Sequence, residues 1–408
     1  MKGKQVVHYG WWVCLGCALL LFCTSGLSIN TFTVYQPYIL EQNQFTNAQS
    51  SMILMVRSVF SFLSMLLAGV YYRRLSLRHG MGLAGLLTAA GFVFFSLSRS
   101  YAAYCLSAAA MGLAYGVGTM IPISIVLEHW FLQKRTLAIS ACSAVTGLST
   151  LGIPSLLTEL IERRGLRFAF SVNAAAVFVL CLISFLLVRS TPAEKGMAPY
   201  GAAQAGEEKP TFGVAGALIG KDWLLLTPML LLIGAVTSVG FSHLTVLIKG
   251  QGFSAHTAAL GVTVCGITLT LGKLLYGALS ERMSTFQSNW LFGGLMVGAL
   301  LLMCASRGSR LLLMLGLLIY GVSLSLTTVG MTAWAGDLSG PGQFDKTIRR
   351  FNLGYAAGSM VFSPLPGILA DLFGGSYVPA YLIFALFALL LLLIIQGIYG
   401  RCARRRRG

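Results

Sequence analysis

Charged residues are scarce in this sequence, and acidic residues are the scarcest of them. Only 10% of the 408 residues are charged, while 56% are hydrophobic. This composition excludes an ordinary soluble protein and is typical of a chain that crosses a membrane many times. Twelve acidic residues against 29 basic ones give a net charge of +17. Nearly all the basic residues lie in loops and tails, so we do not interpret the charge as a nucleic-acid-binding surface, and we expect no nucleic-acid partner.

Motifs for ATP hydrolysis and for catalysis are missing as well. The sequence has no phosphate-binding loop, no ABC-type signature and no Ser/His/Asp set, so we expect neither an enzyme nor a cofactor. The nine cysteines are scattered, mostly through apolar segments, without metal-ligand spacing. We interpret them as packing residues and predict no metal site. The first apolar run is too long for a signal peptide and has no small-residue cleavage site, which indicates a retained span.

Apolar runs long enough to cross a bilayer, about 20 residues each, occur twelve times. They occupy approximately residues 10–35, 49–72, 80–98, 101–127, 136–160, 168–188, 222–248, 256–279, 286–305, 309–334, 349–373 and 376–399. We therefore predict an all-α membrane protein with twelve transmembrane helices.

A linker rich in proline, glycine, alanine and charge separates the sixth span from the seventh, and the sequences on its two sides are related. The segment 134–147 resembles 348–358, and 69–74 resembles 277–282, with an offset near two hundred residues. We predict an N-terminal six-helix bundle at 1–188, a cytoplasmic linker at 189–221 and a C-terminal six-helix bundle at 222–408. Two pseudo-symmetric bundles are typical of transporters that bind substrate near the membrane midplane.

The loop charges predict the orientation of the chain. If successive loops lie on alternate sides, the side of both termini carries twenty Lys and Arg residues, including the basic tail after Arg401. The other side carries seven, which are Arg99, Arg163, Arg164, Arg167, Lys249, Arg307 and Arg310. The positive-inside rule then places both termini in the cytoplasm of a cell inner (plasma) membrane. The basic tail is also expected to contact anionic lipid.

Lys273 lies deep inside the eighth span. It follows His256 by 17 residues and precedes Glu281 by eight, which places it roughly 12 Å inside the nearer end of a helix. An ammonium at this depth costs at least roughly 2.5 kcal/mol on insertion scales, so it indicates a functional site unless a partner explains it. Helical spacing places it on a small, polar stripe with Gly266, Thr270, Gly277 and Ser280. The twelve acidic residues all lie in loops or near helix ends, which favours a substrate anion over a structural carboxylate as the partner.

Arg57 lies at a similar depth in the second span. It shares a stripe with Ser50, Ser61, Ser64 and Ala68, and the alternatives are an anion-binding role or hydrogen bonds to carbonyl groups and snorkelling. His243 in the seventh span is either a proton carrier or a hydrogen-bonded packing residue. Aromatic and amide side chains at cavity-prone positions are candidates for the substrate site or for packing. They are Tyr35, Gln36, Tyr115, Trp334 and Tyr355.

Two loops resemble the cytoplasmic Gly/Asp/Arg loop motif of the major facilitator superfamily. The first runs from Gly69 through Arg73 to Arg78 without the aspartate, and the second contains Gly277, Glu281 and Arg282, with glutamate in its place. The resemblance implies that these six residues belong to a gating motif. Three further stretches are similar to the monocarboxylate transporter and oxalate–formate exchanger branch. They are Tyr9-Gly10-Trp11-Trp12, the segment from Trp130 to Ala138, and the segment from Ser363 to Tyr377.

The branch resemblance implies roles for particular residues. A basic residue in span eight binds the substrate carboxylate in that branch, and Lys273 lies at this position. Proton-coupled members carry an aspartate one turn earlier, where this chain has Leu269. The exchangers carry a second cation inside span eleven, whereas Arg349 and Arg350 lie only at the mouth of that span.

We therefore predict a monomeric secondary transporter of small carboxylates that works by alternating access. Because the interior lacks an acidic proton site, exchange is favoured over proton symport, in which the substrate acid or His243 would have to carry the proton. Two other hypotheses stay open at this point. The first is a drug or sugar carrier of the same fold, and the second is a membrane-embedded enzyme or a non-transporting sensor.

Overall fold

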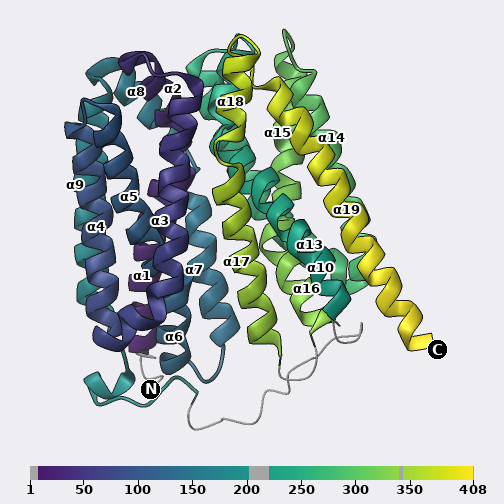
Figure 1. Cartoon of the computed structure of the whole chain (residues 1–408). Helices are drawn as coiled ribbons and strands as arrows, with labels where there is room; N and C mark the ends of the chain where they lie inside the picture. Colours follow the sequence, from purple (N-terminus) through teal and green to yellow (C-terminus); the bar gives the residue numbers. More distant parts are fainter. Residues whose placement is uncertain (1–7, 202–219, 340–342, 408) are drawn as a thin grey trace, which may run out of the picture. The chain divides into compact units, whose positions relative to one another are not determined.

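The computed structural model describes residues 8–201, 220–339 and 343–407, and in these ranges nearly all the chain is helical (Figure 1). The predicted linker 189–221 therefore lies partly outside the described residues. The first half of the chain forms α1 (Tyr9–Leu21), the π-helical η1 (Phe22–Asn30), α2 (Phe32–Asn43), α3 (Asn47–Arg74), α4 (Leu77–Leu97), α5 (Tyr101–Val117), α6 (Met120–Trp130), α7 (Arg135–Leu148), α8 (Ile153–Arg164), α9 (Leu166–Leu187) and the 3₁₀ turn η2 (Pro192–Lys195).

The second half of the chain repeats this succession of helices. It forms α10 (Gly220–Ile233), the π-helical η4 (Gly234–Val239), α11 (Gly240–Ser242), α12 (Leu244–Gly250), α13 (Ala255–Arg282), α14 (Thr285–Cys304), α15 (Arg310–Ser323), the 3₁₀ turn η5 (Leu324–Thr327), α16 (Val329–Leu338), α17 (Phe344–Phe362), α18 (Leu365–Leu372) and α19 (Val378–Arg407). Twelve segments among the described residues are long and apolar enough to cross a membrane. The prediction of twelve transmembrane helices is confirmed.

The breaks in the helices recur with the same order in the two halves. Spans two, three and six are the single helices α3, α4 and α9, and spans eight, nine and twelve are the single helices α13, α14 and α19. The other spans are interrupted, and the first and the seventh are both interrupted by π-helical turns, η1 and η4. Such turns are rare in proteins and are frequent at functional sites. The recurrence shows the pseudo-symmetry of the two six-helix bundles.

Contacts divide the chain into two compact units whose limits cross these halves. The first unit contains Met1–Phe32, Val59–Ile153 and Glu159–Lys209, and the second contains Thr33–Ser58, Pro154–Thr158 and Pro210–Gly408. The second unit therefore includes α2 and the first turns of α3, although these belong to the first half of the sequence. Its own helices pack as α13 on α15, α14 on α15 and α19, and α10 on α17.

Equivalent helices make equivalent contacts inside each unit. In the first unit α4 lies beside α9 and α5, and in the second α14 lies beside α19 and α15 (Figure 1). In a membrane, packing of this kind depends on small residues that let helix backbones approach closely. A Cβ atom added at Gly116 on α5 would lie 1.9 Å from Ser64 Oγ on α3. One added at Gly321 on α15, about 205 residues later, would lie 1.9 Å from Thr268 Oγ1 on α13.

We expect Gly321→Val to destabilise the second unit, because a side chain at this position collides with α13. Overpacking a tight interface typically costs about 1–3 kcal/mol. Gly294→Val on α14 is the matched control, since no atom lies within 4 Å of a Cβ built there. The measurement is the midpoint of thermal unfolding of the purified protein in detergent. Equal midpoints for the two variants would contradict the close approach of α15 to α13.

Candidate functional site

Lys273 lies on a face of α13 that differs from both the apolar side and the buried side of the helix. One side of the helix is apolar and 41–70% exposed, and it consists of Ile267, Leu271, Leu274 and Leu275. The opposite side is buried, and Cys265 donates from Sγ to the carbonyl oxygen of Leu317 on α15 at 3.2 Å. Lys273 lies between these sides on a half-buried stripe with Thr270, and it does not share the apolar face. The ammonium is thus separated from the apolar, exposed face of the helix.

The ammonium of Lys273 is not neutralised by a carboxylate in the part of the chain that the structure describes. The ion pairs of Glu159 with Arg163 and of Glu41 with Lys249 do not include Lys273. The side chain of Glu281, eight residues further along, lies outside the described residues. A buried charge needs a counter-charge or hydrogen bonds to offset its lost hydration. The counter-charge of Lys273 is thus not supplied by either of these ion pairs.

Arg57 belongs to the second unit and points away from the apolar face of α3. Its side chain is only 5% exposed, whereas Leu63 and Leu66 on the same helix are 45% and 53% exposed. Arg57 has contacts of its own, and its positive charge acts on His243. The structure thus brings together Arg57 and His243, two of the residues that the sequence singles out.

His243 is fully buried at the break between α11 and α12, and both of its ring nitrogens are engaged. Nδ1 lies 3.0 Å from the carbonyl oxygen of Val239, which can only accept, so Nδ1 carries a proton. In the neutral ring Nε2 then accepts from the hydroxyl group of Ser51 at 2.9 Å. Ser51 lies on α3, so this hydrogen bond joins two helices that are 192 residues apart in the sequence.

Gln36 and Tyr35 lie side by side in α2 and are buried in the second unit. Both polar atoms of the Gln36 side chain lack a hydrogen-bond partner among the described residues, although the residue is 1% exposed. An unsatisfied buried amide is uncommon and calls for an explanation such as an absent water or ligand. Tyr35, in contrast, has contacts within the protein.

The indole N–H group of Trp334 already forms a hydrogen bond within the second unit. Its indole Nε1 donates to Asn289 Oδ1 at 2.8 Å, and the hydroxyl group of Tyr276 donates to the same oxygen at 3.0 Å. Trp334 and Tyr276 are fully buried. This arrangement favours a packing role for Trp334, the second of the alternatives that the sequence left open.

The remaining aromatic candidates lie in different units. Tyr355 on α17 is half-buried, and its hydroxyl group forms hydrogen bonds with Thr237 and Ser238 of η4. Tyr115 on α5 belongs to the first unit, where it is half-buried and has contacts of its own. Tyr355 thus accompanies Lys273 in the second unit, whereas Tyr115 does not.

The loop motifs differ in how their residues are held. In the first loop the guanidinium group of Arg78 stacks 4.4 Å from the centre of the Phe185 ring, and its Nε donates to the Phe185 carbonyl oxygen. Arg73 and Gly69 on α3 are exposed. In the second loop Arg282 is exposed, and a Cβ at Gly277 would meet no atom within 4 Å.

Sequence reasoning did not single out Ser51, Asn289 or Ser238, which hold the candidate residues in place. An isolated hydroxyl or amide group in an apolar run is a weak signal, because such groups often bond only to their own helix. The lone Asn289 in the ninth span was the strongest of these signals. No three His, Cys, Asp or Glu side chains converge to hold a metal ion in the part of the chain that is described.

Comparison with known proteins identifies relatives across the whole chain. The model of the Major Facilitator Superfamily matches residues 18–306 and 244–405. Monocarboxylate transporter 12 of Mus musculus is 24% identical over 303 residues, which cover 67% of this chain and 61% of the relative. The chain thus spans less than two thirds of that protein. An MFS-type transporter of Gibberella moniliformis is 25% identical over 371 residues, covering 87% of this chain and 83% of the relative.

Solved structures share the fold at low sequence identity. The nucleoside transporter NupG superposes with a TM-score of 0.73 and 15% identity, covering 96% of this chain and 99% of that one. A D-xylose-proton symporter superposes with a TM-score of 0.70 and 13% identity, covering 93% and 96% of the two chains. Identities this low show the fold and leave the substrate open.

We expect Ser51→Ala to destabilise the second unit, because it leaves Nε2 of the buried His243 without its donor. Loss of one partner of a buried hydrogen bond costs about 1–3 kcal/mol. The matched control is Ser171→Ala, since Ser171 is exposed and bonds only to the Arg167 carbonyl group of its own helix. Thermal unfolding in detergent compares the two, and a loss in Ser51→Ala no larger than in the control would refute the contact.

Proposed function

Because the chain belongs to the major facilitator superfamily, we propose that it is a secondary transporter of small organic anions, mono- or dicarboxylates, that works by alternating access. The family match, the named relatives and the fold agree on a membrane transporter and not an enzyme. The finer proposal concerns the substrate, and it depends on the charges of the second unit.

The observation that carries the proposal is the position of Lys273. It lies on a half-buried stripe of α13, away from the apolar face, and forms no ion pair with the described carboxylates. A carboxylate bound there would receive a charge-assisted hydrogen bond and would neutralise the ammonium. The similarity to monocarboxylate transporter 12 is consistent with a substrate of this class.

The other candidate residues take supporting roles in this proposal. Arg57 adds positive charge to the same unit and attracts the anion. The free amide of Gln36 and the hydroxyl group of Tyr355 supply hydrogen bonds that orient the substrate, and Tyr35 lines its path in the second unit. Tyr115, in the first unit, stays a separate candidate for substrate contact. Trp334 shapes the site through Asn289 and does not bind substrate with its indole N–H group, which is already committed.

Exchange of one anion for another is the coupling mode that we favour. The described ion pairs do not include Lys273, and we propose that no carboxylate carries a proton together with the substrate. His243 is the alternative carrier. A proton added to its Nε2 would turn Ser51 from a donor into an acceptor, so the hydrogen bond would survive the change. The ring of Tyr377 lies 6.2 Å from that of His243, and Arg57 interacts with His243 electrostatically, so both would respond to its charge.

A neutral substrate is the second candidate, because carriers of neutral solutes share this fold at identities that leave the substrate open. One is a nucleoside transporter and another a D-xylose-proton symporter. In a drug or sugar carrier, Lys273 would act only in gating. The Gly69–Arg73–Arg78 loop and its second copy at Gly277–Glu281–Arg282 are proposed to gate the cytoplasmic side in either case.

We also propose the location and the lipid contacts of the chain. If successive loops lie on alternate sides, twenty of the loop and tail cations share the side of the termini and seven the other, which supports cytoplasmic termini in a plasma or inner membrane. The basic residues that follow Arg401 would then face anionic headgroups at the cytoplasmic surface.

Replacing Lys273 tests the anion site. In proteoliposomes, we expect Lys273→Gln to reduce the uptake of labelled small carboxylates by about tenfold or more, because a hydrogen bond to a charged group contributes about 1.5–3 kcal/mol. Lys273→Arg should retain part of the uptake, since it keeps the charge. Lys346→Gln, which removes an exposed cation at the start of α17, is the matched control and should transport like the parent.

Two outcomes would contradict the anion proposal. Carboxylate uptake that Lys273→Gln leaves unchanged would remove Lys273 from the site. Uptake of a nucleoside or sugar, unaffected by the same change, would favour the neutral-substrate carrier.

Preloading the vesicles distinguishes exchange from proton coupling. We expect unlabelled carboxylate inside the vesicles to accelerate uptake of labelled carboxylate, while an inward proton gradient adds little, because no acidic proton site accompanies Lys273. His243→Gln should then exchange like the parent. Uptake that is driven by the proton gradient and lost in His243→Gln would instead assign the proton to His243.

A further inference from the structure

Polar contacts in the second unit join the loop ends that follow spans one, seven and eleven. In a chain of alternating spans these three loops share one side of the membrane, the side opposite both termini. The contacts connect α2 and the start of α3, which precede the linker, to α12 and α18, which follow it. They therefore join segments from the two halves of the sequence.

Asp371, near the end of α18, binds the first turn of α3. Its Oδ1 accepts from the backbone N–H group of Asn47 at 2.9 Å and from the Asn47 side chain at 2.8 Å, and Oδ2 accepts from the N–H group of Ala48 at 2.8 Å. The hydroxyl group of Tyr377 donates to Asn47 Oδ1 at 3.0 Å and orients that amide. A carboxylate at a helix N-terminus is also favoured by the helix dipole.

Helix α3 does not need Asp371 in order to begin. Thr46 and Gln49 already form a local capping box, in which Thr46 Oγ1 accepts from the N–H group of Gln49 and Gln49 Oε1 accepts from the N–H group of Thr46. Asp371, in contrast, lies 324 residues after Asn47 in the sequence. Its function is thus to join α18 to α3, because the helix end is capped without it.

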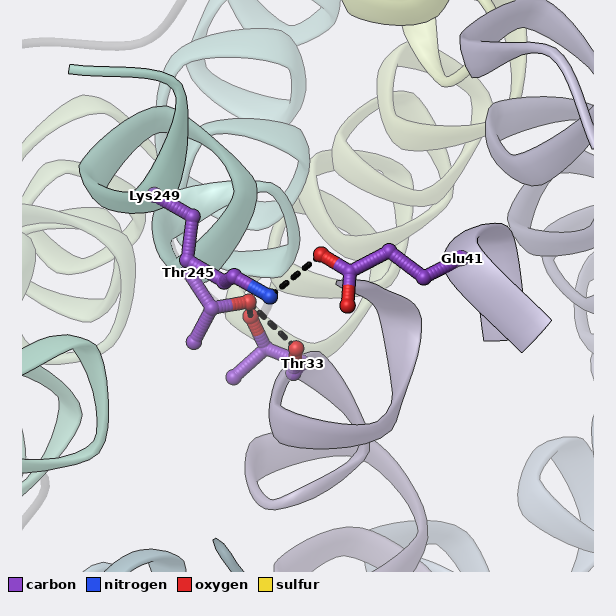
Figure 2. A network of polar contacts seen from close by, with 4 residues as sticks. All are labelled: Thr33, Glu41, Thr245 and Lys249. Atoms are coloured by element: carbon purple, nitrogen blue, oxygen red, sulfur yellow. Dashed lines mark hydrogen bonds and ion pairs between the residues drawn. The ribbon is translucent and has the colours of Figure 1, made fainter. Parts of the chain in front are cut away.

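Three further contacts act beside this one. Lys249 on α12 forms an ion pair with Glu41 on α2 at 2.5 Å, and its ammonium lies 5.2 Å from the centre of the Tyr38 ring. Figure 2 shows this pair next to Thr33 and Thr245, whose hydroxyl groups lie 3.1 Å apart. The buried hydrogen bond of Ser51 to His243 is the third.

The backbones also touch at this end. A Cβ atom at Gly367 on α18 would lie 2.1 Å from the Asn47 carbonyl oxygen. The polar groups around this contact are exposed, so water can replace each partner when the contact opens. Exposed ion pairs and hydrogen bonds of this kind can be broken and re-formed at little net cost.

We propose that Asp371 with Asn47, and Lys249 with Glu41, form a latch that holds the transport path shut on the side opposite the termini and opens once in each transport cycle. Alternating access requires the two halves of the sequence to separate on one side at a time. These contacts, together with those of Thr33 with Thr245 and of Ser51 with His243, join the two halves and would have to break for that movement. The proposal depends on the transporter family alone and is independent of the substrate.

A cysteine reporter tests the latch without any substrate. Thr270→Cys places a thiol on the half-buried stripe of α13 next to Lys273, and a membrane-impermeant maleimide is applied separately to each face of the membrane in vesicles of known orientation. The same protein without Thr270→Cys measures labelling of the native cysteines. We expect Asp371→Asn to raise labelling from the side opposite the termini by at least about threefold and to lower it from the other side, as a shift between two populated states requires.

Matched variants separate the latch from a loss of stability. Asp371→Glu keeps the charge and should stay close to the parent, and Glu159→Gln removes a carboxylate from an exposed ion pair within α8 and should leave both rates unchanged. Glu41→Lys and Lys249→Glu should each raise labelling from the opposite side, and the double variant should restore it. Unchanged labelling in Asp371→Asn and in the single charge reversals, or labelling that rises from both sides together, would overturn the proposal.

Discussion

A cation can persist in a membrane-spanning helix only where it avoids lipid, and α13 shows how the chain meets this constraint. Apolar side chains occupy the exposed face of the helix, and small or polar groups that pack on α15 occupy the buried face. Lys273 lies between them. The rest of the second unit is consistent with this placement, because the aromatic and amide groups around Asn289 fill the interior without supplying a counter-charge.

Much of this architecture could be predicted from the sequence because it depends on local periodicity. The twelve apolar runs and the stripe of Lys273 follow from spacing along single helices, and the relation between the halves follows from similar segments about two hundred residues apart. The structure adds that the relation extends to the packing, since Gly116 and Gly321 close the same helix pair in each half. A repeat that is faint in sequence is thus clear in the order of helix breaks and in the tight crossings.

The contacts between distant helices could not be predicted in this way. Nothing near Ser51 indicates that it faces His243, and nothing near Asp371 indicates that it binds the start of α3. Such pairs depend on the rotation and depth of two helices relative to each other, and a single sequence does not specify either quantity. For the same reason, Trp334 was a candidate for substrate contact until the structure showed its N–H group bound to Asn289.

The π-helical turns have a consequence for the residues that follow them. Each widened turn accommodates an additional residue, which rotates the rest of the helix by about 100° relative to an uninterrupted α-helix. Gln36 follows η1 and His243 follows η4, so their angular positions are set by these turns. Insertion or deletion of one residue between Phe22 and Asn30 would therefore turn a different set of side chains inward. Chains of this architecture can thus change the chemistry of their interior without any substitution among the residues that line it.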